Sequence, residues 1–275
     1  MNAAFPYRVG QRLLTIEGLG VSYGAPVLHQ VDAAIDNLIR DGMQQGQVVC
    51  LLGPSGIGKT QLFRCIAGLQ TPDQGAVFLN GQRSPVTPGA VGVVAQHYPL
   101  LNHRTVLGNL LVAAMRHGGG RAAASERAMQ LLGQLGLAER ALAYPGQLSG
   151  GQRQRVAIAL QLLCSSHFLL MDEPFSGLDP GAKATVCETI RALSTADELN
   201  TVIVVTHDID SALRIADTIW LLGRDPGPDG KPAGGARIVD KVDLIARGLA
   251  WHTDIDGTEE FQQLSKELAA RFPRL

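Results

Sequence analysis

One short glycine-rich segment constrains this chain more than any other feature. The segment reads Gly53-Pro54-Ser55-Gly56-Ile57-Gly58-Lys59-Thr60. It follows a continuous apolar run, Gln47–Leu52, which is typical of a buried parallel strand. It opens a stretch, Lys59–Leu69, whose apolar residues recur at helical spacing. A strand before and a helix after form the context in which this pattern binds phosphate, and that context argues against a glycine-rich turn that matches by chance.

The residue types in this segment suit a phosphate group for physical reasons. Glycines allow successive backbone N–H groups to turn inward around phosphate oxygens without a clash at Cβ. The N-terminus of the following helix adds partial positive charge. Lys59 can reach the β- and γ-phosphates of a nucleotide, and the Thr60 hydroxyl can ligate Mg²⁺. We therefore expect residues 53–60 to bind the phosphates of a nucleotide.

Further apolar runs alternate with helical patterns along the chain. Strands are expected at Leu13–Tyr23, Ala76–Leu79, Val91–Ala95, Phe168–Met171, Val202–Val205 and Thr218–Leu222. Helices are expected within Thr105–Leu137 and at Gln152–Cys164 and Glu259–Arg271. Strand–helix–strand order of this kind implies an α/β fold with a mostly parallel sheet. The helical stretch at about 97–160 interrupts that order, so a helical subdomain is expected to be inserted there.

Two carboxylates end the strand expected at Phe168–Met171. Alone, Asp172 and Glu173 could simply mark the end of a strand, but here they share a chain with a phosphate loop. Asp172 is then expected to hold Mg²⁺, directly or through water, and Glu173 to orient and deprotonate the attacking water. A lone histidine is more often a surface or core residue; because His207 follows another sheet strand, it is expected to donate a hydrogen bond to the γ-phosphate.

Composition excludes several classes of protein. The formal net charge is -1, so no overall positive field favours nucleic acid as a partner. The four cysteines form no CxxC pair and are interpreted as reduced core thiols. No uncharged apolar run approaches the length of a membrane span, and the N-terminus lacks a signal pattern, so contact with a membrane would require a partner.

A second glycine motif indicates the family. Leu148-Ser149-Gly150-Gly151-Gln152 precedes a predicted helix and resembles the signature motif of ATP-binding cassette (ABC) ATPases. In that family the motif contacts the γ-phosphate bound to the other protomer, so that two chains enclose two ATP molecules head to tail. Ser149, Gly150, Gly151 and Gln152 are therefore implied nucleotide-binding residues. The motif also makes an anion-binding helix end on chemical grounds.

The resemblance implies roles for three more segments. Gln96 is similar to the glutamine-loop residue, near Mg²⁺ and the membrane partner and a contributor to catalysis. Ser176–Asp179 resembles the loop that crosses the dimer interface, which places Asp179 at the nucleotide. Tyr23 resembles the aromatic residue that stacks on adenine, although a tyrosine at a strand end is a core residue about as often.

The family pattern covers about residues 13–224. It implies an α/β fold with a P-loop NTPase core, a mostly parallel sheet, an antiparallel N-terminal β part and the inserted helical subdomain. We therefore predict an ABC nucleotide-binding domain at 1–224, followed by a loop and a C-terminal appendage of unassigned role at 225–275. The chain departs from the pattern at Ala159-Leu160-Gln161, where the family usually has Ala-Arg-Ala. The stretch 36–47 is also a few residues longer than usual.

The resemblance implies an ATPase that uses ATP and Mg²⁺ to power a membrane transporter. Motifs around Tyr144-Pro145, Glu173–Asp179 and Thr206–Ala212 are most similar to bacterial importers of the nitrate, sulfonate and taurine type. The implied partners are a second copy or a second ABC ATPase, integral membrane permease subunits and an extracytoplasmic solute-binding protein. The implied location is peripheral, on the cytoplasmic face of the inner membrane.

The sequence fits three other functions less well. A soluble cassette ATPase of DNA repair would need long coiled coils, and only about 50 residues without sustained heptads separate Gln96 from the signature. A non-hydrolysing regulatory subunit would not need Lys59, Asp172, Glu173 and His207 together. The chain could also be the ATPase of an ABC exporter. Only the resemblance of its motifs to those of importers favours import.

Overall fold

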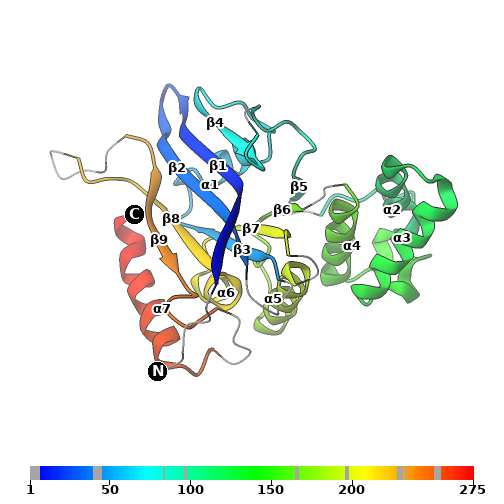
Figure 1. The fold of residues 1–275 in the computed structure, drawn as a ribbon. Coiled ribbons are helices and arrows are strands. Elements are labelled where there is room, and N and C mark those ends of the chain that lie inside the picture. Colours follow the sequence, from blue (N-terminus) through cyan, green and yellow to red (C-terminus); the bar gives the residue numbers. More distant parts are fainter. Residues whose placement is uncertain are drawn as a thin grey trace.

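The computed structural model shows an α/β body with a separate helical lobe at its side (Figure 1). It describes residues 7–39, 45–82, 84–95, 98–164, 167–195, 198–227, 232, 234–250 and 255–275.

A six-stranded sheet forms the centre of the body, in the order β5-β6-β7-β3-β8-β9. Its strands are β3 (Gln47–Leu52), β5 (Gly92–Val94), β6 (Phe168–Asp172), β7 (Thr201–Thr206), β8 (Thr218–Gly223) and β9 (Arg237–Asp243). All neighbouring pairs are parallel except β8 and β9, which are antiparallel. The predicted α/β class with a mostly parallel sheet is therefore confirmed.

The central strand β3 is buried at every residue. Val48, Cys50 and Leu52 pack into one hydrophobic core and Val49 and Leu51 into the other, because successive side chains of a strand point to opposite faces. This explains why the strand reads as an uninterrupted apolar run.

A three-stranded antiparallel sheet, β2-β1-β4, covers one face of the body. Its strands are β1 (Arg8–Tyr23), β2 (Ala25–Ile39) and β4 (Gln74–Leu79). Helix α1 (Lys59–Ile66) shares a core with this sheet. The antiparallel N-terminal part implied by the resemblance is thus present, and β2 is a strand that the sequence analysis did not predict.

Helices α5, α6 and α7 pack against the other face. They span Pro180–Ser194, Ile209–Ile215 and Glu259–Arg271. Short 3₁₀ turns occur at Met115–His117, Ala138–Arg140, Pro145–Gln147 and Phe272–Arg274. Within the described residues no helix is both long and apolar enough to cross a bilayer.

The helical lobe has a core of its own. It consists of α2 (Val106–Ala114), α3 (Gly120–Gln134) and α4 (Gly150–Leu162). A hydrogen bond joins α4 to the edge of the main sheet, because the side-chain oxygen Oε1 of Gln161 accepts from the backbone N–H of Val93 in β5 at 3.1 Å. The departure from the family pattern at Gln161 therefore provides a link between the lobe and the sheet.

Residues after 224 extend the main sheet and its core. Strand β9 pairs along β8, and Phe261, Leu264 and Leu268 of α7 are buried in the core cluster that contains alternate residues of β3. The domain boundary at residue 224 stays a prediction, and the described residues beyond it pack as part of the body.

Replacing Leu264 by alanine tests this packing. Leu264 is 0% exposed, so Leu264→Ala is expected to lower the free energy of unfolding by about 2–5 kcal/mol through lost burial and a cavity. The neighbouring exposed residue Gln263 provides the control, because Gln263→Ala should change the free energy of unfolding by less than about 0.5 kcal/mol. Chemical denaturation measures both. An unchanged main transition in Leu264→Ala would mean that α7 unfolds separately from the body.

Candidate nucleotide site

The glycine-rich loop connects the end of β3 to the start of α1. A Cβ at Gly53 would lie 2.8 Å from the Leu222 carbonyl oxygen, and Gly58, the N-cap of α1, has a φ of 113°. Glycine is needed at both positions, for space at the first and for backbone conformation at the second. The loop thereby places the N-terminus of α1 at the carboxyl edge of the sheet.

Lys59 holds its ammonium group over this loop. Its Nζ donates hydrogen bonds to the carbonyl oxygens of Gly53 at 2.7 Å and Pro54 at 3.1 Å. The same atom lies 3.7 Å from Glu173 Oε1. Burial lowers the pKa of Lys59, and the charges of Glu173 and Asp172 oppose that shift. Lys59 is thus buried, with its ammonium facing two carboxylates, where it can also meet phosphate oxygens.

Glu173 stands at the turn that follows β6. Its backbone φ is 48°, a left-handed conformation that few residues other than glycine adopt, and its N–H donates to the Val205 carbonyl at 2.8 Å. Its Oε2 accepts a hydrogen bond from Thr206 Oγ1 at 3.2 Å and lies 2.9 Å from His207 Nδ1. The carboxylate is therefore positioned by two consecutive residues at the end of β7.

Asp172 supplies a second carboxylate beside Glu173. Burial, followed by the charge of Glu173, raises the pKa of Asp172, and Lys59 and Arg64 oppose the shift. A raised pKa means that the ionised form of the carboxylate is disfavoured, and a nearby cation stabilises that form. Within the described part of the chain no three His, Cys, Asp or Glu side chains gather into a metal site. Mg²⁺ prefers oxygen ligands, and the Asp172 carboxylate is an oxygen ligand that such a cation would stabilise.

A cavity of about 290 Å³ opens over the loop. Its lining comprises Val27, Ser55, Gly56, Gly58, Lys59, Thr60, Gln61 and Glu173. The structure therefore brings five of the predicted loop residues and Glu173 to one cavity, while Gly53, Pro54 and Ile57 are not in its lining.

Tyr23 lies near this cavity and outside the core. Its side chain is 61% exposed, so the alternative of a core tyrosine does not hold. Its hydroxyl donates to Gln61 Oε1 at 3.2 Å and accepts from Gln70 Nε2 at 2.9 Å. Because Gln61 lines the cavity, an exposed aromatic ring stands next to the phosphate loop.

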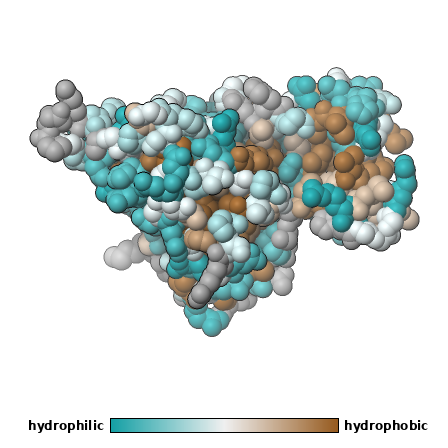
Figure 2. Space-filling view, turned by 90° about the horizontal axis from the view of Figure 1, so that it is seen from above, coloured by the Kyte–Doolittle hydropathy of each residue, from teal (hydrophilic) through white to brown (hydrophobic). Residues whose placement is uncertain are grey.

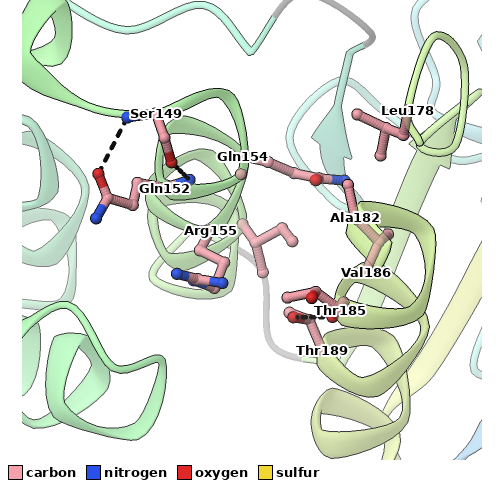
Figure 3. Close-up of a pocket in the computed structure, with 11 residues that line it drawn as sticks. Ser149, Gln152, Gln154, Arg155, Leu178, Ala182, Thr185, Val186 and Thr189 are labelled. Carbon is pink, nitrogen blue, oxygen red and sulfur yellow. Dashed lines mark hydrogen bonds between the residues drawn. The ribbon is translucent and has the colours of Figure 1, made fainter. Parts of the chain in front are cut away.

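Ser149 begins helix α4 in a reciprocal cap. Its hydroxyl oxygen accepts from the Gln152 N–H at 3.2 Å, and Gln152 Oε1 accepts from the Ser149 N–H at 3.0 Å (Figure 3). Ser149, Gly151 and Gln152 line a different cavity, between α4 and α5, and the two linings share no residue. One chain therefore does not bring the signature residues into its own phosphate cavity.

Of the two remaining expected residues, the structure describes Asp179 but not Gln96. Asp179 is exposed and caps α5, accepting a hydrogen bond from the Ala182 N–H at 3.0 Å. Gln96 lies outside the described residues. The sequence analysis missed Thr206, which is 0% exposed and holds Glu173; its position at the end of an apolar strand beside His207 was the available signal.

Comparison with known proteins identifies the family. The family model described as "ABC transporter" matches residues 39–176, half of the chain. The chain belongs to the ABC transporter family.

Several relatives extend this ABC assignment. A methionine import ATP-binding protein of Thermobifida fusca is 37% identical, covering 74% of this chain and 66% of the relative. A sulfate/thiosulfate import ATP-binding protein of Ralstonia nicotianae is 43% identical, covering 66% of this chain and 50% of the relative. The chain thus spans between half and two thirds of the length of these relatives.

Solved structures agree with the ABC fold. A transporter described as metal-chelate type, in an inward-facing conformation, is 26% identical with a TM-score of 0.65, covering 77% of this chain and 79% of that one. CbiO1 of Clostridium perfringens, part of the ABC transporter complex cbiONQ, is 21% identical with a TM-score of 0.71, covering 94% and 99%. The second likeness concerns the fold alone.

Two threonines of β7 allow the positioning of Glu173 to be tested. Thr206 and Thr201 are both 0% exposed, but Thr201 donates to the Leu199 carbonyl at the other end of the strand. Thr206→Val and Thr201→Val should each lower the free energy of unfolding by about 1 kcal/mol, because each loses a buried hydrogen bond. Only Thr206→Val should slow ATP hydrolysis, on the order of tenfold, because a displaced catalytic group loses rate steeply. Equal hydrolysis in the two folded variants would contradict this role.

Proposed function

We propose that this chain binds ATP and Mg²⁺, hydrolyses ATP and thereby powers a membrane transporter that imports a small solute. One observation supports the activity most directly: Lys59, Asp172, Glu173 and His207 converge at the carboxyl edge of the sheet, beside the cavity over the phosphate loop.

Each of these residues has a chemical task in the proposed reaction. Lys59 neutralises phosphate charge from within the loop, and Glu173 accepts the proton of the attacking water. His207 holds Glu173 through the 2.9 Å contact and can also face the γ-phosphate. Bound Mg²⁺ would supply charge neutralisation between phosphates, with the Thr60 hydroxyl and the Asp172 carboxylate as its protein ligands. Gln96 is assigned near Mg²⁺ from its motif alone.

The separate position of Ser149 supports action as a dimer. Its helix end carries N–H groups that have no intrahelical partner, which favours an anion, yet it does not line the phosphate cavity of its own chain. A second copy, or a second ABC ATPase, would supply this end to the γ-phosphate, with Gly150, Gly151 and Asp179 nearby. Closure and opening of this pair is the proposed mechanical step.

An exposed apolar surface supports a membrane partner. Large apolar side chains exposed on the helical lobe are Leu101, Val112, Met115, Leu142 and Tyr144. Apolar surface gathers over the lobe in the space-filling view, at the right of Figure 2. Such patches mark interaction sites. We assign this surface to a permease subunit, which would hold the chain at the cytoplasmic face of the inner membrane.

The cargo is proposed only as a small solute. The relatives cited above are named for methionine and for sulfate or thiosulfate. The narrower prediction of a nitrate, sulfonate or taurine importer, with an extracytoplasmic binding protein, stays a prediction. Export, or a soluble role, is the alternative that the partner experiment below decides.

Replacing Glu173 by glutamine tests hydrolysis and the dimer together. Glu173→Gln keeps the shape of the side chain and removes the base, so ATP hydrolysis should fall by roughly 100-fold or more while ATP still binds. The variant should accumulate as a dimer with ATP in size-exclusion chromatography. Wild-type protein with ATP and the variant without nucleotide are the controls. Intact ATP binding with rapid hydrolysis would contradict the role of Glu173, and a persistent monomer would contradict the dimer.

Recovery of membrane proteins tests the partner surface. Tagged chain purified from gently solubilised membranes should carry a multi-span membrane protein in near-stoichiometric amount. Met115→Glu and Leu142→Glu should reduce that recovery several-fold, since each places a charge in an apolar contact. Leu69→Glu changes a side chain that is 57% exposed outside the lobe and should not reduce it. Recovery of soluble partners alone would contradict a transporter role.

A further inference from the structure

A second cavity, of about 250 Å³, lies between helices α4 and α5. One wall is formed by residues of α4, including Gln154 and Arg155, and the other by residues of α5, including Thr185 and Thr189 (Figure 3). It lies apart from the phosphate loop, and no residue of that loop lines it. Ser149, Gly151 and Gln152 of the signature motif also line it, but the role assigned to that motif does not involve Arg155, Thr185 or Thr189.

Arg155 gives this cavity a positive charge without a partner. Its Nε is buried, and within the described residues that atom has no hydrogen-bond partner and the guanidinium forms no ion pair. No carboxylate side chain lines the cavity. A buried guanidinium donor without an acceptor is unfavourable, and an anion that enters the cavity would satisfy it.

The rest of the lining is mixed in character. Ile158, Leu178 and Val186 present apolar side chains. The hydroxyls of Thr185 and Thr189 donate to backbone carbonyls of their own helix, at 3.2 Å and 2.8 Å, which leaves the hydroxyl oxygens as polar atoms on that wall. The cavity therefore offers a cationic group, two hydroxyls and apolar surface. Small-molecule sites have this combination of apolar lining and a few polar groups.

We propose that this cavity binds a small organic anion, a carboxylate or sulfonate with a short apolar body, whose charged group meets Arg155. If the chain is the ATPase proposed above, on which this step rests, binding of the anion would regulate it. Helix α4, which forms one wall, begins at its N-cap Ser149, and helix α5, which forms the other wall, begins at its N-cap Asp179. A ligand that bridges the two helices fixes the spacing of these two loops and so limits the movement of the lobe during the ATP cycle.

Titration with 1-butanesulfonate, in the absence of nucleotide, tests the binding site. Amide NMR resonances of residues in α4 and α5, above all Thr185 and Thr189, should shift and saturate. Arg155→Gln should weaken binding at least about tenfold, the loss expected for a charged hydrogen-bond donor. The control is Arg153→Gln, which removes the same charge from an exposed position of the same helix outside the lining and should bind as the wild type does. 1-Butanol, which shares the apolar body without the charge, should bind more weakly.

Several outcomes separate this site from the phosphate loop. Shifts confined to Gly56 and Thr60 would mean that the sulfonate occupies the phosphate loop, and would overturn the proposal. Equal binding by Arg155→Gln and the wild type would also overturn it. Should Arg155→Gln not fold, Val186→Phe fills the cavity with Arg155 intact and should abolish the shifts in α5; unchanged shifts there would count against the site. ATP hydrolysis can fail without affecting these measurements, so the two proposals are tested separately.

Discussion

The burial of β3 between β7 and β8 is the constraint on which the site depends. The two neighbours run parallel to β3, in register from Gln47 to Leu52 on the β7 side. Asp217, just before β8, reinforces this arrangement by accepting a hydrogen bond from the Val48 N–H at 2.6 Å. Parallel strands end at one edge, so the phosphate loop after β3 and His207 after β7 emerge side by side. The geometry of the candidate site is thus a consequence of strand direction more than of any single contact.

The same constraint explains which strands could be predicted from the sequence. Strands buried on both faces, such as β3 and β7, have continuous apolar runs, and these predictions agree with the structure. Strand β2 was missed because its buried and exposed residues alternate with irregularities and its pairing with β1 has register shifts. Strand β9 (Arg237–Asp243) was also missed. It lies at the edge of the sheet, where charged residues are common, and its sequence therefore lacks a continuous apolar run. Half-buried strands contain too little local signal to be distinguished from loops.

The residues of the candidate site likewise fall into those that the sequence could predict and those that it could not. Lys59, Asp172 and Glu173 could be predicted as site residues because each belongs to a short motif whose spacing is typical of a phosphate or metal site, and the structure places Lys59 beside Glu173. The role of Thr206 depends on a contact with Glu173 across 33 positions of sequence, which local pattern does not encode. Within the part of the chain that the structure describes, Arg155 Nε is buried without a hydrogen-bond partner, and this is a property of packing between two helices that only the structure can reveal.

The cap at Ser149 connects these observations to the proposed dimer. Its hydroxyl oxygen accepts from the Gln152 N–H, so the hydroxyl hydrogen is still free to be donated to an anion. The Gln152 side chain satisfies the Ser149 N–H, which fixes the helix end before any ligand arrives. A helix end that is preorganised for an anion in this way, yet outside the phosphate cavity of its own chain, supports the proposal that it meets phosphate presented by another molecule. Each chain would then hold one nucleotide with its loop and complete the site of its partner with α4, so hydrolysis in one chain would release the contact that joins both.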